Sequence, residues 1–291
     1  MANENFATTL AQSLPYVIQS ARLTNVYAGV MPRLVDRRTQ GQGEGLDWNE
    51  IALANLTAQD MTNTTRNENF QLLSDTKTSV RESLVGLSIK ITDHAQRRWS
   101  KNVATMVGDL GQRAMSTKKD KNLLAIGSSA STDLGTAGNP MTSSLVGAGV
   151  NRVRSNRTEP NADSPVYVVM TGPHKFDIEE ELNAGIGTYP IPAGLTADVF
   201  RGGFSGSLRQ AEAYVDDNLT VDSADDAIAM VFAGGRGGGI IHVEAESRAV
   251  NIRDEYLSDG ADVMLMTQRY ATGIRQQTWV YAITADSQQA S

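Results

Sequence analysis

One run of the sequence, from Gly86 to Leu110, passes from a strand-like pattern into a helix-like pattern with no loop between them. Leu87, Ile89 and Ile91 alternate with polar residues, which is the period of a half-buried strand. Such a run joins a strand stiffly to a helix. It therefore constrains the fold more than any other part of the chain.

The helix that follows is predicted to be unusually long. Asp93 and Gln96 have the spacing of a capping box, and the helical pattern continues to about Ile126, where Gly127 stops it. A helix of about 34 residues is about 50 Å long, enough to act as a spine for the molecule. We expect its apolar stripe to face a sheet made by the C-terminal strands. The stripe consists of Trp99, Val103, Met106 and Leu110.

A polar stretch from Asp47 to Lys77 precedes this spine, and it is rich in Thr, Asn, Gln and charged residues. So few apolar side chains cannot offset the entropy lost when the stretch is ordered. Two interpretations remain open. The stretch is either an arm, for which a long two-stranded hairpin is a suitable form, that a neighbouring subunit orders, or a disordered surface loop.

The rest of the chain separates its strands from its helices. The segment "SPVYVVMTGPHKFDIEEELN" predicts a buried strand, a Gly-Pro turn and a helix. The segments "AIAMVFAG" and "DVMLMTQRYATGIRQQTWVYAITAD" predict further strands, some of them antiparallel. This segregation predicts the α+β class.

Composition excludes several classes of protein. The chain of 291 residues has no cysteine, which rules out disulfides and thiolate chemistry. No apolar run approaches the roughly 20 residues of a membrane span, and the N-terminus lacks the features of a signal peptide. The net charge of −7 argues against tight, sequence-independent DNA binding by the whole surface.

No motif for catalysis, metal binding or cofactor binding is found. The three histidines are isolated in the sequence, "GGFSGS" lacks the final glycine of a nucleophile elbow, and "AGGRGGGI" lacks the lysine of a phosphate loop. We interpret the glycine run as a mobile loop. The acidic residues between Asp216 and Asp226 lack the pattern of a calcium loop and are interpreted as a solvated turn. We predict a protein that is not an enzyme and has no cofactor.

The order of these parts resembles the major capsid protein of tailed bacteriophages, the Hong Kong 97-type coat fold. The segments "GLSIKITDHAQRRW", "PVYVVMTGPHKFDIEEEL" and "DVMLMTQRYATGIRQQTWVYAITAD" carry the resemblance. It implies an N-terminal arm, an extended hairpin loop that reaches over a neighbour, a long spine helix, and peripheral and axial domains. The implied boundaries are 1–45 for the arm, 46–85 for the loop, 86–127 with 243–276 for the peripheral domain, and 128–242 with 277–291 for the axial domain.

The resemblance also implies a function. The chain would assemble, as hexameric and pentameric capsomers, into an icosahedral shell around double-stranded DNA. Assembly would take place in the cytoplasm of the host bacterium, and the finished shell would be the capsid of the virion. Scaffolding, portal and decoration proteins would be its partners; no membrane and no sequence-specific DNA contact are expected. An encapsulin-like compartment and an unrelated secreted binding protein remain alternatives. Residues expected at contacts between subunits are Arg66, Lys77, Arg81, Gly235 and Arg236.

Overall fold

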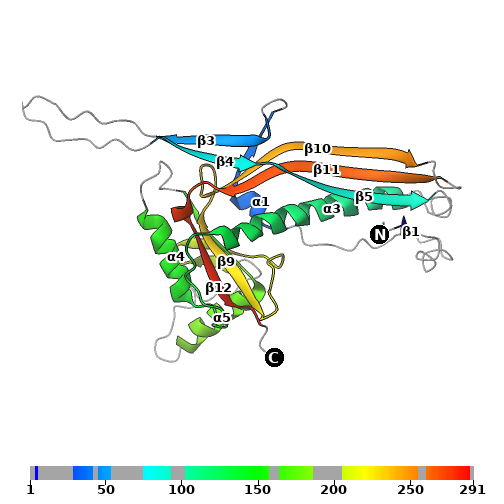
Figure 1. Cartoon of the computed structure of the whole chain (residues 1–291). Helices are drawn as coiled ribbons and strands as arrows, with labels where there is room; N and C mark the ends of the chain where they lie inside the picture. The colour runs from blue at the N-terminus through cyan, green and yellow to red at the C-terminus, as the bar shows by residue number, and fades with distance from the viewer. Residues whose placement is uncertain are drawn as a thin grey trace, which may run out of the picture.

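The computed structural model describes residues 4–5, 29–41, 45–53, 75–92, 102–156, 164–185, 205–254 and 260–288. In this part of the chain two five-stranded sheets and a two-stranded hairpin are joined by one long helix. The first sheet runs alongside the helix, and the second stands across the end of it (Figure 1). The α+β class predicted from the sequence is confirmed. None of the described helices is long and apolar enough to span a membrane.

The first sheet, called the long sheet, is built mainly from three strands. Their order within the sheet is β1-β5-β11-β10-β2. The strands are β1 (Glu4–Asn5), β2 (Asp36–Thr39), β5 (Ser83–Thr92), β10 (Ile240–Asp254) and β11 (Ala261–Ile274). β11 lies antiparallel to both β5 and β10, in a register that pairs Met266 with Leu87 and Leu265 with Val250.

The long helix α3 (Asn102–Leu124) packs on one face of this sheet. Gly111 lies at the contact, where an added Cβ would stand 2.8 Å from the Met266 sulfur and 3.5 Å from Leu87. The expected apolar stripe is wrong at Leu110, which is 38% exposed. The small Gly111 permits the closest approach to the sheet, so the helix turns that residue inward and Leu110 outward. Trp99 and the side chains of Val103 and Met106 lie outside the described part.

The second sheet, called the body sheet, has the order β12-β9-β6-β8-β7. Its strands are β6 (Val166–Met170), β7 (Ser205–Leu208), β8 (Ala211–Val215), β9 (Asp226–Ala233) and β12 (Val280–Asp286). Helix α4 (Ser143–Ser155) packs against one face, and α5 (Gly172–Gly185) follows β6. The other face packs against the end of α3, the 3-10 turn Ala125–Ser129 and the short helix α1 (Met31–Leu34).

The polar stretch ahead of the spine contains a hairpin in the part that is described. β3 (Asp47–Leu53) pairs antiparallel with β4 (Asp75–Arg81), and the residues between them are outside the described ranges. Trp48 and Val80, at the base of the hairpin, pack against the long sheet. The hairpin then projects away from that sheet (Figure 1).

Candidate functional site

The face of the long sheet turned away from α3, called the outer face, is covered at one end only. There the hairpin base lies on Ile241, Val243 and Ala271, which are 2% exposed or less. Further along, Ile252 on β10 is 50% exposed and Leu84 on β5 is 64% exposed. The outer face of the long sheet is therefore covered near the hairpin base and open toward its far end.

A β-bulge decides which side chains of β10 reach the outer face. Glu244 pairs with Tyr270 and Glu246 pairs with Arg269, so Ala245 is the extra residue. Such an insertion exchanges the two faces of a strand from that point on. Before the bulge, odd-numbered residues such as Val243 point outward; after it, even-numbered residues such as Val250 do.

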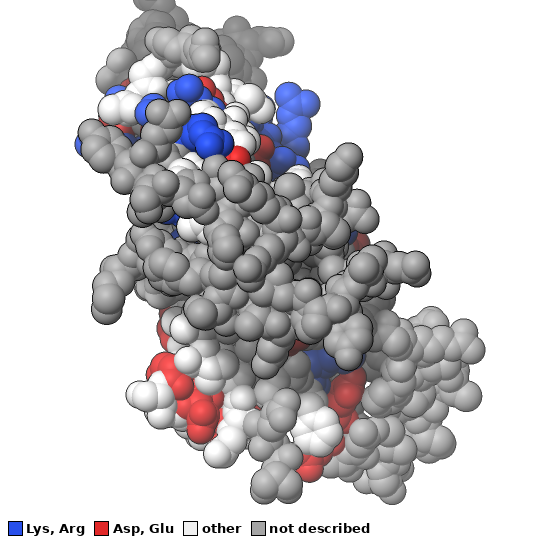
Figure 2. Space-filling view, turned by 90° about the vertical axis from the view of Figure 1, so that its right-hand side faces the viewer, with Lys and Arg blue, Asp and Glu red and all other residues white. Residues whose placement is uncertain are grey.

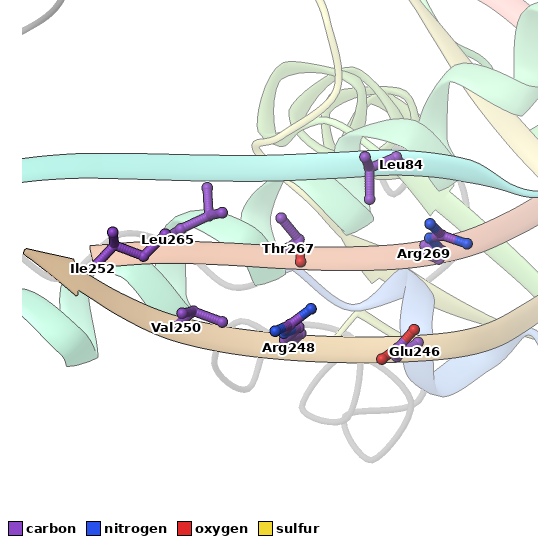
Figure 3. A pocket seen from close by; sticks show the side chains of 8 residues that line it. All are labelled: Leu84, Glu246, Arg248, Val250, Ile252, Leu265, Thr267 and Arg269. Atoms are coloured by element: carbon purple, nitrogen blue, oxygen red, sulfur yellow. The ribbon is translucent and has the colours of Figure 1, made fainter. Parts of the chain in front are cut away.

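The open end of the outer face forms a shallow groove with a volume of about 320 Å³. Figure 3 shows its side chains projecting from β5, β11 and β10. They are Leu84, Glu246, Arg248, Val250, Ile252, Leu265, Thr267 and Arg269. Apolar groups in this groove lie beside charged ones, an arrangement typical of a contact surface for protein rather than of a catalytic pocket.

The charges of the groove are concentrated near the hairpin. Arg269 lies 3.6 Å from the carboxylate of Glu82, at the start of the strand that returns from the hairpin. It also stands opposite Glu246 on β10. The far end of the groove, around Val250 and Ile252, is the apolar end.

Arg275 joins the hairpin, β2 and the glycine loop 234–239 at one point. Its guanidinium donates to Glu50 of the hairpin at 2.9 Å, to Asp36 of β2 at 2.7 Å and to the Gly238 carbonyl at 2.7 Å. Burial alone would raise the pKa of Asp36, but the hydrogen bonds from Arg275 and the Gly237 amide, together with the charges of Arg275 and Arg38, lower it. Arg275 therefore fixes the direction in which the hairpin leaves the sheet.

The hairpin itself presents uncovered apolar groups. Ile51 is 62% exposed and Leu53 is 68% exposed, and they alternate with the less exposed Glu50 and Ala52. Apolar side chains in a row on one face of a projecting hairpin are typical of a surface that another protein covers.

The glycine loop is more tightly built than the mobile loop expected from the sequence. The Gly234 amide donates to Pro165, the Gly235 amide to Leu34 and the Gly239 amide to Ala233. A Cβ at Gly234 would stand 2.0 Å from the ring of Tyr167, so only glycine fits there. The loop thus ties the body sheet to the residues around α1.

The residues predicted at subunit contacts fall into two groups. Lys77 and Arg81 are exposed on the hairpin, where Arg81 lies 4.0 Å from Asp47 of the same chain. Gly235 has a φ of +73°, and its exposed neighbour Arg236 shares the loop with it. Arg66 lies outside the described residues.

Sequence reasoning missed the groove and Arg275. Both depend on the register between strands that are far apart in the chain. The one local signal was the alternation of apolar and charged residues on the two long strands, which indicates a half-buried sheet but does not say which half lacks a cover.

The inner face of the long sheet carries a partly buried ionic network against α3. Lys119 lies 2.6 Å from Glu244, which also bonds to Arg37 and to His242. Burial raises the pKa of Glu244, but the bonds and charges of Lys119 and Arg37 outweigh it and lower the pKa to about 2. Burial, aided by Lys119 and Arg37, lowers the pKa of His242 to about 4 despite Glu244. This network fastens the spine helix to the sheet.

The described residues contain no group of three or more His, Cys, Asp or Glu side chains placed to hold a metal ion. In Figure 2 basic groups, with some acidic ones among them, are visible at the level of the long sheet, and mostly acidic groups are visible at the level of the body sheet. The groove and the hairpin are the candidate site, because both leave apolar side chains exposed.

No protein-family model and no curated protein matches the sequence. Solved structures do match. The head of Helicobacter pylori bacteriophage KHP40 is 10% identical, with 99% of this chain and 100% of that chain covered and a TM-score of 0.67. A Mycobacterium phage Che8 structure is 18% identical over 92% and 96%, with a TM-score of 0.65. The Ralstonia phage GP4 capsid is 12% identical over 88% of both chains, with a TM-score of 0.65. The chain has the fold of phage capsid proteins.

Proposed function

We propose that this chain is the major capsid protein of a tailed bacteriophage, a structural subunit that assembles into an icosahedral shell around double-stranded DNA. One observation carries the proposal: the fold extends over nearly the full length of both chains in the match to a phage head. The open groove and the projecting hairpin support it, because both leave apolar surface for other subunits to cover.

A DNA-filled shell is favoured over a compartment that encloses enzymes. The matched structures include phage heads and a GTA particle capsid. The acidic net charge of −7 suits a shell wall that encloses DNA without binding it tightly. Hexameric and pentameric capsomers, scaffolding, portal and decoration partners, and assembly in the bacterial cytoplasm are part of this proposal.

Contacts between subunits are assigned to the hairpin and the groove. The uncovered Ile51 and Leu53 of one subunit would lie against the apolar end of a neighbour's groove, around Val250 and Ile252. The chain's own hairpin base already packs on the sealed end of the same outer face. A neighbour's hairpin would continue that cover along the sheet.

The charged residues would set the register of these contacts rather than their strength. Arg66, Lys77 and Arg81 are assigned to acidic groups of adjacent subunits. Gly235 and Arg236 are assigned to contacts around a capsomer axis. Of the hairpin charges, Lys77 is the sharpest probe, because Arg81 already has Asp47 close by in its own chain.

Electron microscopy of the purified protein tests the function. Closed particles of uniform size, filled with DNA when isolated from phage lysates, are the expected result. Particles that enclose a second protein would support the compartment instead. A protein that remains monomeric at every concentration and salt condition would overturn the proposal.

Charge reversal tests the assigned contacts separately. Lys77→Glu with Arg66→Glu should give folded subunits that fail to close into shells. Lys118→Glu, an exposed position on α3, is the control and should assemble normally. Normal shells from the double variant would remove these charges from the interface while leaving the shell function intact.

A further inference from the structure

Two buried carboxyl groups hold the chain where it enters the body. The Met31 amide donates to Asp120 of α3 at 3.0 Å, and the Val30 amide donates to Asp216, just after β8, at 2.9 Å. Both carboxyl groups belong to residues with no exposed surface. The backbone at positions 30 and 31 is therefore tied to two parts of the chain that are remote in sequence.

The backbone approaches Asp120 so closely that only glycine fits. Gly29 has a φ of +80°, and a Cβ there would stand 1.9 Å from the Asp120 carboxyl carbon. A side chain at this position would have to displace the carboxyl group. The approach is thus a built feature of the junction, independent of any protonation state.

The two carboxyl groups are also tied to each other. The Asn218 side chain donates to Asp120 at 2.9 Å and the Asn218 amide donates to Asp216 at 3.0 Å, so one residue holds the two carboxyl groups side by side. Asp216 accepts from two backbone amides, those of Val30 and Asn218. Two adjacent carboxyls in a dry site cannot both be ionised without a large cost.

The charges around the pair do not relieve this repulsion. Burial first, and then the charge and hydrogen bond of Asp216, raise the pKa of Asp120 to about 7, against the lowering effects of Asn218 and Met31. On α3, Lys119 is directed to Glu244, and Lys121 is exposed. Arg33 of α1 and Asp217 of the turn after β8 are exposed as well.

We propose that Asp120 and Asp216 form a proton-controlled latch on the entry segment Gly29–Met31. With one shared proton the latch is closed. Loss of that proton places two negative charges side by side and loosens the segment from α3 and the body sheet. This inference goes beyond the shell function and does not depend on it, because every group involved lies within one chain.

The sign of the pH dependence follows from the raised pKa. A carboxyl whose folded pKa lies above its unfolded value of 3.8 takes up a proton on folding. Its stabilising contribution is full below the unfolded value and is lost as pH rises through about 7. In that window opening of the latch releases one proton, so its equilibrium should shift about tenfold per pH unit and level off above.

Hydrogen exchange at the Val30 and Met31 amides of the full chain tests the latch. After correction for intrinsic exchange rates, protection should fall about tenfold per pH unit between pH 5 and 7. Asp120→Asn should abolish this slope. The control Asp177→Asn, which changes a carboxyl that accepts the Met141 amide, should keep it. Wild-type protection that does not change with pH, or an unchanged slope in Asp120→Asn, would overturn the proposal.

A second measurement needs no variant. The side-chain carboxyl carbon of Asp120, followed by NMR in the wild-type chain, should titrate near pH 7. Titration near the ordinary value of 3.8 would overturn the latch even if Asp120→Asn failed to fold.

Discussion

The two sheets of this chain differ in how much of their surface is buried within the chain. In the body sheet, seven of the eight residues of β9 are buried, and β12 is nearly as enclosed. In the long sheet, most residues of β5 and β11 are only partly buried or exposed, and the distal half of β10 is largely exposed. The body sheet is complete within one chain, whereas the long sheet needs cover from outside. Stability and assembly should therefore depend on different residues.

The largest expected effect is in the body sheet. Phe232 on β9 has no exposed surface and packs edge-on against Tyr167, with ring centroids 6.1 Å apart. Phe232→Ala should lower the free energy of unfolding by about 3–5 kcal/mol, because it leaves a cavity in a closed core. Chemical denaturation of isolated subunits measures the loss. A loss below about 1 kcal/mol would mean that the body is not a complete core on its own.

The next largest effect is at the joint between the two sheets. Arg275→Gln removes the closer of the two arginines that face Asp36, whose side chain is 3% exposed, and leaves Arg38 at 3.2 Å. Breaking a buried pair in this way should cost about 2–4 kcal/mol, and the hairpin amides should exchange faster. The control Arg37→Gln changes an arginine that is 55% exposed and should cost less than about 1 kcal/mol. Equal losses in the two variants would contradict a fixing role for Arg275.

The pH dependence of the inner face should be smaller and of known sign. His242 is fully buried, and its pKa is lowered from 6.5 to about 4. As pH falls, the unfolded chain therefore binds the proton at a higher pH than the folded chain does. The stability contributed by neutral His242 is present above pH 6.5 and is lost as pH falls through about 4. The loss should reach about 2–3 kcal/mol.

Comparison of variants isolates this contribution. His242→Gln should flatten the decline between pH 6.5 and 4 in denaturation experiments on isolated subunits. His174→Gln should leave the part due to His242 in place. If His242→Gln keeps the full decline, the inner face is not the source of the pH dependence.

The smallest effect on stability is expected at the open groove. Leu84→Ser and Ile252→Ser change side chains that are 64% and 50% exposed, so each should alter the stability of isolated subunits by about 0.5 kcal/mol or less. The same changes should reduce the yield of closed shells, as counted by electron microscopy. Asn251→Ser, on the other side of β10, is the matched control. Unchanged shell yield in all three variants would break the contrast between the two sheets.

Local patterns predicted the parts of the fold that depend on local chemistry. The alternation of Leu87, Ile89 and Ile91 correctly placed these residues on one face of β5, and the spine helix and the α+β class were predicted as well. The periodicity did not predict the phase of the helix, because the contact at Gly111 depends on Met266, which is far along the chain.

Like the groove and Arg275, the polar contacts that hold distant segments together could not be predicted from the sequence. Asp216 and Asp226 read as members of a solvated acidic turn, yet they are buried because each accepts backbone amides from distant segments. Lys119 was interpreted as one of several solvated lysines, yet it bonds from α3 to Glu244 of the long sheet. Pairings of this kind depend on which segments meet in three dimensions, and nothing in a single sequence records that.

The extra residue at Ala245 makes β10 sensitive to insertions and deletions in a particular way. Removing it would exchange the two sides of everything beyond: Val250 and Ile252 would turn toward α3, and Ser247 and Asn251 would replace them outside. Point changes in the distal half of β10 alter one side chain at a time, whereas a single lost codon would rewrite a whole surface. β10 thus presents one set of side chains to its own subunit and another set to the exterior. A single extra residue decides which side chains belong to which set.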